Sequence, residues 1–114
     1  MTAEDRAIAR FASEVHRYYG ERLRGLFLFG SRARGDHTTE SDADIAVVLQ
    51  DGDWNFWDEK MRLVDFGFEP MLDEGVYIQP WPVALSEWEA PDKHRNPRLI
   101  RAMRRDAKSL QGVA

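Results

Sequence analysis

The sequence contains no cysteine, which excludes disulfide bonds, thiolate catalysis and the commonest structural zinc sites. No apolar run approaches the roughly 18 residues of a membrane-spanning helix, and the first residues do not resemble a signal peptide. Basic residues are also few, 16 against 20 acidic ones, so the net charge is −4. This balance argues against a broad basic surface for nucleic acid. We therefore expect a cytoplasmic protein with no membrane segment.

The chain does contain enough apolar residues for a core of its own. Hydrophobic residues make up 43% of its 114 positions, unlike a disordered tail. A chain of this length is close to the common size of a domain. We therefore expect residues 1–114 to form a single domain.

Hydrophobic periodicity predicts helices that alternate with short buried strands. Thr2 and Asp5 resemble a capping box at the start of the first helix. Pro70 is expected to kink or interrupt the long central helix, and Ser86 to cap a brief helical turn. Pro80 and Pro82 confine their strand to a sheet edge or to a short paired stretch. Helices are predicted at 3–19, 31–35, 54–74 and 97–109, and strands at 26–29, 45–49 and 76–83. This order predicts an α/β (α+β) fold with a small mixed sheet of three to four strands flanked by helices.

The segment between the first two strands carries the functional pattern. Gly30 has no Cβ, so the backbone can approach a bulky anion, and Ser31 offers a hydroxyl and an N–H where a helix begins. Asp42 and Asp44 lie two residues apart at the start of a strand, so they point to the same face. Two neighbouring carboxylates repel each other unless a divalent cation lies between them and a substrate. Their hard oxygen ligands suit Mg²⁺ or Mn²⁺.

Gly30-Ser31, ten intervening residues and then Asp42-x-Asp44 resemble the signature of the DNA polymerase beta-type nucleotidyltransferase superfamily. The short chain resembles its minimal branch, the MNT proteins, many of which are antitoxin partners of HEPN toxins. The resemblance implies that Gly30, Ser31 and Arg32 bind the nucleotide phosphates. It also implies that Asp42 and Asp44 are the catalytic residues that bind Mg²⁺ or Mn²⁺.

The implied reaction is transfer of AMP from ATP to a hydroxyl group, a tyrosine of a HEPN toxin. Arg34, like Arg32, is adjacent to the phosphate site, and one of the two arginines is expected to add donors, since they point apart on a helical turn.

The pattern departs from the family in one respect. Active members carry a third carboxylate on a later strand, but the strand that contains Tyr77 and Gln79 has no Asp or Glu. Strand alternation puts Tyr77 and Gln79 on one face, so either of them takes the missing position. Asp73 and Glu74 are near in sequence but lie in the preceding turn.

A neutral amide cannot act as a base. The alternative function is therefore a binding module of weak or no activity that neutralises a HEPN toxin by complex formation. The four tryptophans offer two further interpretations, because each is either a core residue or part of a partner surface. They are Trp54, Trp57, Trp81 and Trp88.

Overall fold

A four-stranded mixed sheet lies at the centre of the protein, in a computed structural model that describes residues 1–38 and 41–110. β1 pairs antiparallel with both β2 and β4, whereas β2 and β3 run parallel. The spatial order of the strands is β3-β2-β1-β4. Their bounds are β1 Leu23–Phe29, β2 Ala43–Leu49, β3 Ile78–Ala84 and β4 Lys108–Ser109. The predicted α/β fold with a small mixed sheet is confirmed.

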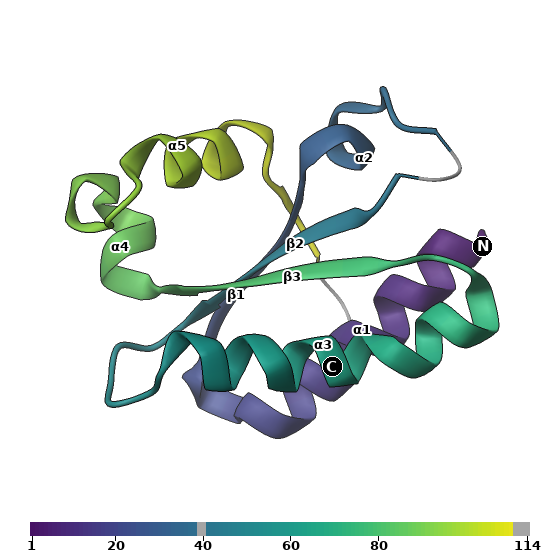
Figure 1. Cartoon of the computed structure of the whole chain (residues 1–114), viewed down its shortest axis with the longest axis horizontal. Coiled ribbons are helices and arrows are strands. Elements are labelled where there is room, and N and C mark those ends of the chain that lie inside the picture. Colours follow the sequence, from purple (N-terminus) through teal and green to yellow (C-terminus); the bar gives the residue numbers. More distant parts are fainter. Residues whose placement is uncertain (39–40, 111–114) are drawn as a thin grey trace.

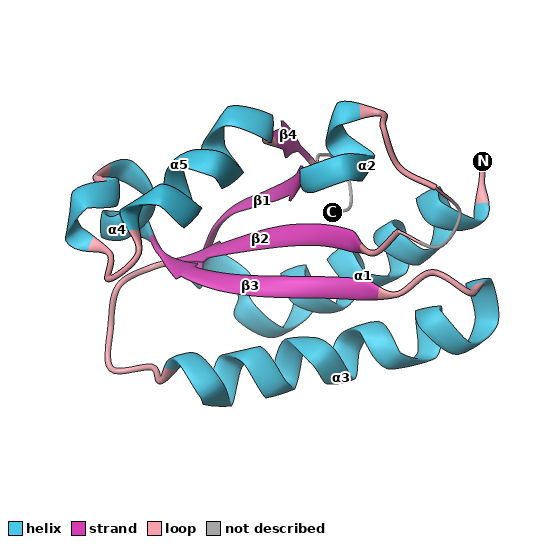
Figure 2. Ribbon diagram, turned by 45° about the horizontal axis from the view of Figure 1, so that its top comes forward, coloured by secondary structure: helices cyan, strands magenta, loops and turns pink. Residues whose placement is uncertain are grey.

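Helices lie on both sides of this sheet (Figure 1 and Figure 2). The two long helices, α1 (Ala3–Tyr19) and α3 (Phe56–Glu74), cover one face. The other side carries α4 (Leu85–Glu89) and α5 (Pro97–Asp106), with the short α2 (Gly30–Arg34) at the end of β1. Single 3-10 turns occupy Gly20–Arg22 and Pro91–Lys93. Within residues 1–38 and 41–110, no helix is both long and apolar enough to cross a membrane.

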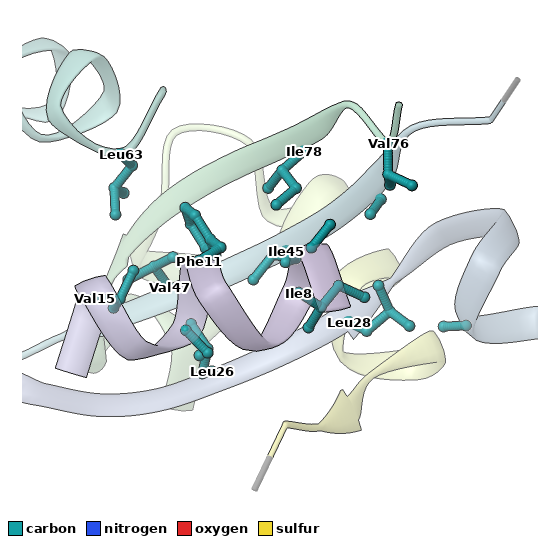
Figure 3. Packing of buried hydrophobic residues seen from close by; sticks show 14 of the residues in the cluster. Ile8, Phe11, Val15, Leu26, Leu28, Ile45, Val47, Leu63, Val76 and Ile78 are labelled. Atoms are coloured by element: carbon teal, nitrogen blue, oxygen red, sulfur yellow. The ribbon is translucent and has the colours of Figure 1, made fainter. Parts of the chain in front are cut away.

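Two apolar clusters, one on each face of the sheet, form the core. The larger one joins α1 to alternate residues of the strands, with Phe11, Ile45 and Val47 fully buried (Figure 3). The smaller one lies under α5, where Ile100 and Met103 are buried. Because successive strand residues point to opposite faces, β1, β2 and β3 each contribute to both clusters.

The long helices start where local side chains satisfy their free N–H groups. The Thr2 hydroxyl accepts from the Asp5 N–H at 3.0 Å, and the Asp5 carboxylate accepts from the Thr2 N–H at 3.1 Å. This reciprocal pair confirms the predicted capping box. Asn55 caps α3 through its side-chain oxygen, which accepts from the Trp57 N–H at 2.9 Å.

The interruption predicted at Pro70 is absent, because α3 continues through this residue to Glu74. Pro70 removes one helical hydrogen bond, but the turn that follows is held against α1 by two ion pairs. Arg6 Nε donates to Glu74 at 3.0 Å, and Arg10 donates to Asp73 at 2.8 Å. Tertiary contacts therefore retain a turn that proline alone disfavours.

Predictions for the last third of the chain are confirmed in part. β3 is an edge strand, which is one of the two arrangements predicted from its prolines. The helix predicted at 97–109 is present as α5, with Asn96 as its cap. It ends at Asp106 and not at 109, and Lys108–Ser109 pairs with β1. The predicted cap at Ser86 is wrong. Its N–H and hydroxyl both donate to the Asp51 carboxylate, so Ala84 is the N-cap residue of α4 and no side chain caps the helix.

Candidate active site

The turn from β1 into α2 places Gly30 directly against Asp44. Gly30 has a φ of +74°, in the region that favours glycine. A Cβ built on Gly30 would lie 2.4 Å from Asp44 Oδ2, closer than such atoms approach. Glycine is therefore required here both by the backbone and by the carboxylate beneath it.

Asp44 lies on the face of β2 that looks toward α5. It pairs in register with Phe29 of β1 and with Gln79 of β3, so the three side chains share that face. Its carboxyl group is partly buried, whereas Asp42 is exposed. Burial raises the pKa of Asp44, and the negative charge of Asp42 raises it further. The positive charges of Lys60 and Arg34 lower the pKa of Asp44, against these two effects.

The parallel register decides between the two candidates for the third position. Gln79 is directly opposite Asp44, whereas Tyr77 lies before β3 begins and is 48% exposed. Gln79 is therefore the residue beside Asp44 where the resemblance implies a carboxylate. Asp73 and Glu74, the nearby acids, pair with arginines of α1 on the other layer of the domain.

Lys60 is a member of this site that the sequence did not point to. It extends from α3 to the free edge of β3, where its ammonium donates to the Pro80 carbonyl and lies 3.5 Å from Gln79 Oε1. The same ammonium is 4.5 Å from the centre of the Trp81 ring, within cation–π range. Burial lowers the pKa of Lys60, and the charge of Asp44 partly offsets this. A fixed cation therefore stands next to the amide that replaces the third acid.

The two arginines of α2 have different surroundings. Arg32 is buried, and its guanidinium pairs with Glu4 of α1 and donates from Nε to the Ser41 carbonyl at 2.8 Å. These contacts fasten α2 to α1 and give no support to its predicted role as a phosphate ligand. Arg34 is exposed and donates to Asp106 at 2.8 Å, and its charge acts on Asp44. Of the pair, Arg34 has the better position for an anion at the site.

The donor atoms at this site fit a hard divalent cation. Asp42 and Asp44 supply carboxylate oxygens whose mutual repulsion such an ion would relieve, and Gly30 leaves space above Asp44. Within the part of the chain that the structure describes, no cluster of three or more His, Cys, Asp or Glu side chains could hold a metal. The described residues therefore offer two acidic ligands, and a nucleotide would have to complete the coordination.

A pocket of about 650 Å³ lies further along β3, away from the carboxylates. Trp54, Trp57 and Trp81 line one side of it, and Leu99 and Met103 of α5 line another. Its lining residues include neither Asp42 nor Asp44. We therefore place the candidate chemistry at the Gly30 turn and not in this pocket.

The site is thus a glycine–serine turn that lies over an acidic strand end of a mixed sheet. The nucleotidyltransferase domain model matches residues 8–106, so the chain belongs to the nucleotidyltransferase domain family.

Relatives with the same kind of name were found in Methanocaldococcus jannaschii. One of them, named "Putative protein adenylyltransferase MJ0604", is 45% identical over 75 residues, which cover 66% of this chain and 68% of the relative. A second relative from this organism, named "Putative protein adenylyltransferase MJ0141", is 27% identical over 73 residues, which cover 64% of this chain and 72% of the relative.

Among solved structures, one described as "Crystal structure of the toxin-antitoxin with AMP-PNP" superposes with a TM-score of 0.55. The two chains are 24% identical, and the superposition covers 91% of this chain and 73% of the other. At this level of identity the likeness supports the fold.

Proposed function

We propose that this chain is the antitoxin of a toxin–antitoxin pair and transfers AMP from ATP to a hydroxyl group of its toxin. The observation that carries the proposal is the seating of the Asp44 carboxylate directly beneath Gly30, with the charge of Asp42 beside it. The relatives named as protein adenylyltransferases support the reaction, and the toxin–antitoxin structure supports the type of partner. We infer a HEPN toxin and a tyrosine acceptor from the motif resemblance, and a cytoplasmic location.

In the proposed mechanism, Gly30 and Ser31 bind the terminal phosphates of ATP. Asp42 and Asp44 would hold Mg²⁺ or Mn²⁺, and the ion would supply positive charge that offsets the triphosphate and favours ionisation of the acceptor hydroxyl. The acceptor oxygen attacks the α-phosphorus as the bond to the β-phosphate breaks. Pyrophosphate leaves, and the hydroxyl proton passes to water. Arg34 provides positive charge next to the carboxylates.

A second candidate function follows from Gln79. Gln79 places an amide beside Asp44, with the Lys60 ammonium 3.5 Å from it, and among residues 1–38 and 41–110 no third carboxylate completes the cluster as a base. General-base catalysis typically contributes about 10²–10⁴-fold, so transfer without it is slow. The alternative is therefore a protein that neutralises its toxin by forming a complex, with little or no transfer.

ATP labelled at the α- or the γ-phosphate tests the proposal. Purified protein is incubated with Mg²⁺, labelled ATP and the product of the adjacent gene. We expect label on that partner from α-labelled ATP and none from γ-labelled ATP, which separates AMP transfer from phosphorylation. In Asp42→Asn/Asp44→Asn, transfer and the rise in melting temperature caused by Mg²⁺ and ATP should both be lost. A stable complex that acquires no label would support the binding-module alternative, and an unchanged ATP effect in the double variant would refute the assigned site.

A further inference from the structure

Helix α3 has a second apolar face, which points away from the core. Trp57, Met61, Phe68 and Leu72 are 67%, 58%, 54% and 64% exposed, and Val64 lies between them. At 100° per residue these side chains form one stripe along the helix. Leu63, which is fully buried, faces the sheet from a different side of α3. Figure 2 shows α3 on the outside of the molecule, with the sheet and α1 on one side of it only.

The spacing of the stripe matches the geometry of a helical partner. Its members follow one another at steps of four, three, four and four residues, close to the repeat with which one helix packs along another. From Trp57 to Leu72 the stripe spans roughly 22 Å at 1.5 Å per residue. Large exposed apolar patches of this kind mark interaction sites. Of the tryptophans, Trp57 is therefore the one that fits the partner surface considered from sequence.

One flank of the stripe is acidic. Asp58, Asp65 and Glu69 all lie on the side of the stripe nearer α1, and all are exposed. Glu69 is 3.9 Å from Arg10, and among the described residues no ion pair forms with Asp58 or Asp65. A partner helix with basic side chains along this flank would place opposite charges together.

We propose that the outer stripe of α3 binds an amphipathic helix of a partner protein, with lysine or arginine residues facing Asp58 and Asp65. The proposed function requires a protein partner, and this inference adds where and by what chemistry it binds. The proposed binding surface lies on α3 alone and does not include the nucleotide site, so its binding is tested without nucleotide.

A second copy of this chain fits the stripe less well. In an antiparallel pair of α3 helices the same flanks meet, so Asp58 and Asp65 would approach the carboxylates of the other copy. The basic helix α5 has the required charge, but its apolar residues Ile100 and Met103 are already buried. Each arrangement leaves either the charge or the apolar stripe unmatched.

The probe for this surface is a synthetic helical peptide of about 22 residues, long enough to cover the stripe. Leucines follow the same four-three-four spacing and lysines occupy the flanks; a matched peptide carries glutamate in place of lysine. Tryptophan fluorescence, assigned with Trp57→Phe, reports binding, and sedimentation reports the oligomeric state.

We expect a monomer that binds the lysine peptide at least about tenfold more tightly than the glutamate peptide at low salt, with a smaller difference at high salt. Phe68→Ser should weaken binding at least about tenfold. Tyr18→Ser, which removes an exposed ring outside the stripe, should not. Asp58→Asn/Asp65→Asn should abolish the preference for lysine.

Absence of binding, equal affinity for both peptides, or unchanged binding in Phe68→Ser would overturn the inference. A dimer that Phe68→Ser dissociates would also overturn it, because the stripe would then bind a second copy. Peptide binding without AMP transfer would leave this surface in place while refuting the enzymatic proposal.

Discussion

The two faces of β2 differ sharply, although they alternate along one seven-residue strand. Toward α1 and α3 the strand presents Ile45 and Val47, both fully buried. Toward α5 it presents Asp44, a partly buried carboxyl group whose pKa is raised by burial and by the negative charge of Asp42. The first face therefore stabilises the fold along its whole length, whereas the second combines the buried Ala46 and Val48 with a carboxyl group that costs stability. A shift of one residue in register would exchange these roles.

The carboxylates in the interior follow the same division. Between α1 and α3 the buried Glu59 is paired: the Tyr19 hydroxyl donates to its carboxylate at 2.8 Å, and Arg62 donates to it at 2.7 Å. On the site face, Asp42 and Asp44 repel each other. This repulsion is the expected cost of a site that is complete only when a cation and a nucleotide bind.

The largest effect on stability should come from the buried face. Ile45→Ala removes a fully buried side chain from the larger cluster, and we expect the free energy of unfolding to fall by about 2–5 kcal/mol. Urea denaturation measures this change. The neighbouring variant Asp44→Asn is the control, because it alters the other face without opening a cavity. Equal losses in the two variants would contradict the separation of the faces.

Gly30→Ala should disturb the site more than the fold. Forcing alanine to a positive φ costs about 1–2 kcal/mol, and the new Cβ would displace the Asp44 carboxylate. Gly35→Ala is a matched control, since Gly35 has a φ of +84° and nothing lies within 4 Å of its added Cβ. Both variants should lose similar stability, but only Gly30→Ala should lose the rise in melting temperature with Mg²⁺ and ATP. Loss of that response in both variants would show that backbone strain, and not the contact with Asp44, controls binding.

A smaller effect is expected where the third carboxylate is missing. Gln79→Glu alone should gain little activity, because the nearby Lys60 ammonium would pair with the new carboxylate. Adding Lys60→Met frees that carboxylate, and we expect the double variant to transfer AMP at least about tenfold faster than wild type. Labelled ATP gives the rates, and binding of the toxin should not change. A wild type that is rapid, and is slowed by both changes, would show that the site is complete as it stands.

Much of the fold was predictable because its signals are local. The capping box at Thr2 and the continuous apolar run of Ile45 to Leu49 each specify an element from a few adjacent residues. β4 was not predictable, because Lys108–Ser109 is a two-residue strand with both side chains exposed and no hydrophobic pattern.

The site was predictable only where its residues are close in sequence. The spacing of Gly30 and Asp44 anticipated that both belong to one site, and the structure brings them into contact. Lys60 and the pairing of Arg32 with Glu4 depend on how helices lie against the sheet, over separations of 19 and 28 residues. Such contacts leave no periodic trace in the sequence.

The smallest effect should be a pH dependence on the site face. The pKa of Asp44 is raised in the native protein, so between about pH 4, near the unfolded value, and the higher native value the folded state binds more protons. The free energy of unfolding therefore decreases as pH rises through this window. At neutral pH, Asp44→Asn should be more stable than wild type, by at most about 1 kcal/mol because solvent screens a partly exposed group. Urea denaturation in EDTA at pH 7, repeated below pH 4, should show the difference between the two proteins disappearing in acid. If Asp44→Asn is instead the less stable protein at pH 7, its carboxylate stabilises the fold, and the division between the faces of β2 does not hold.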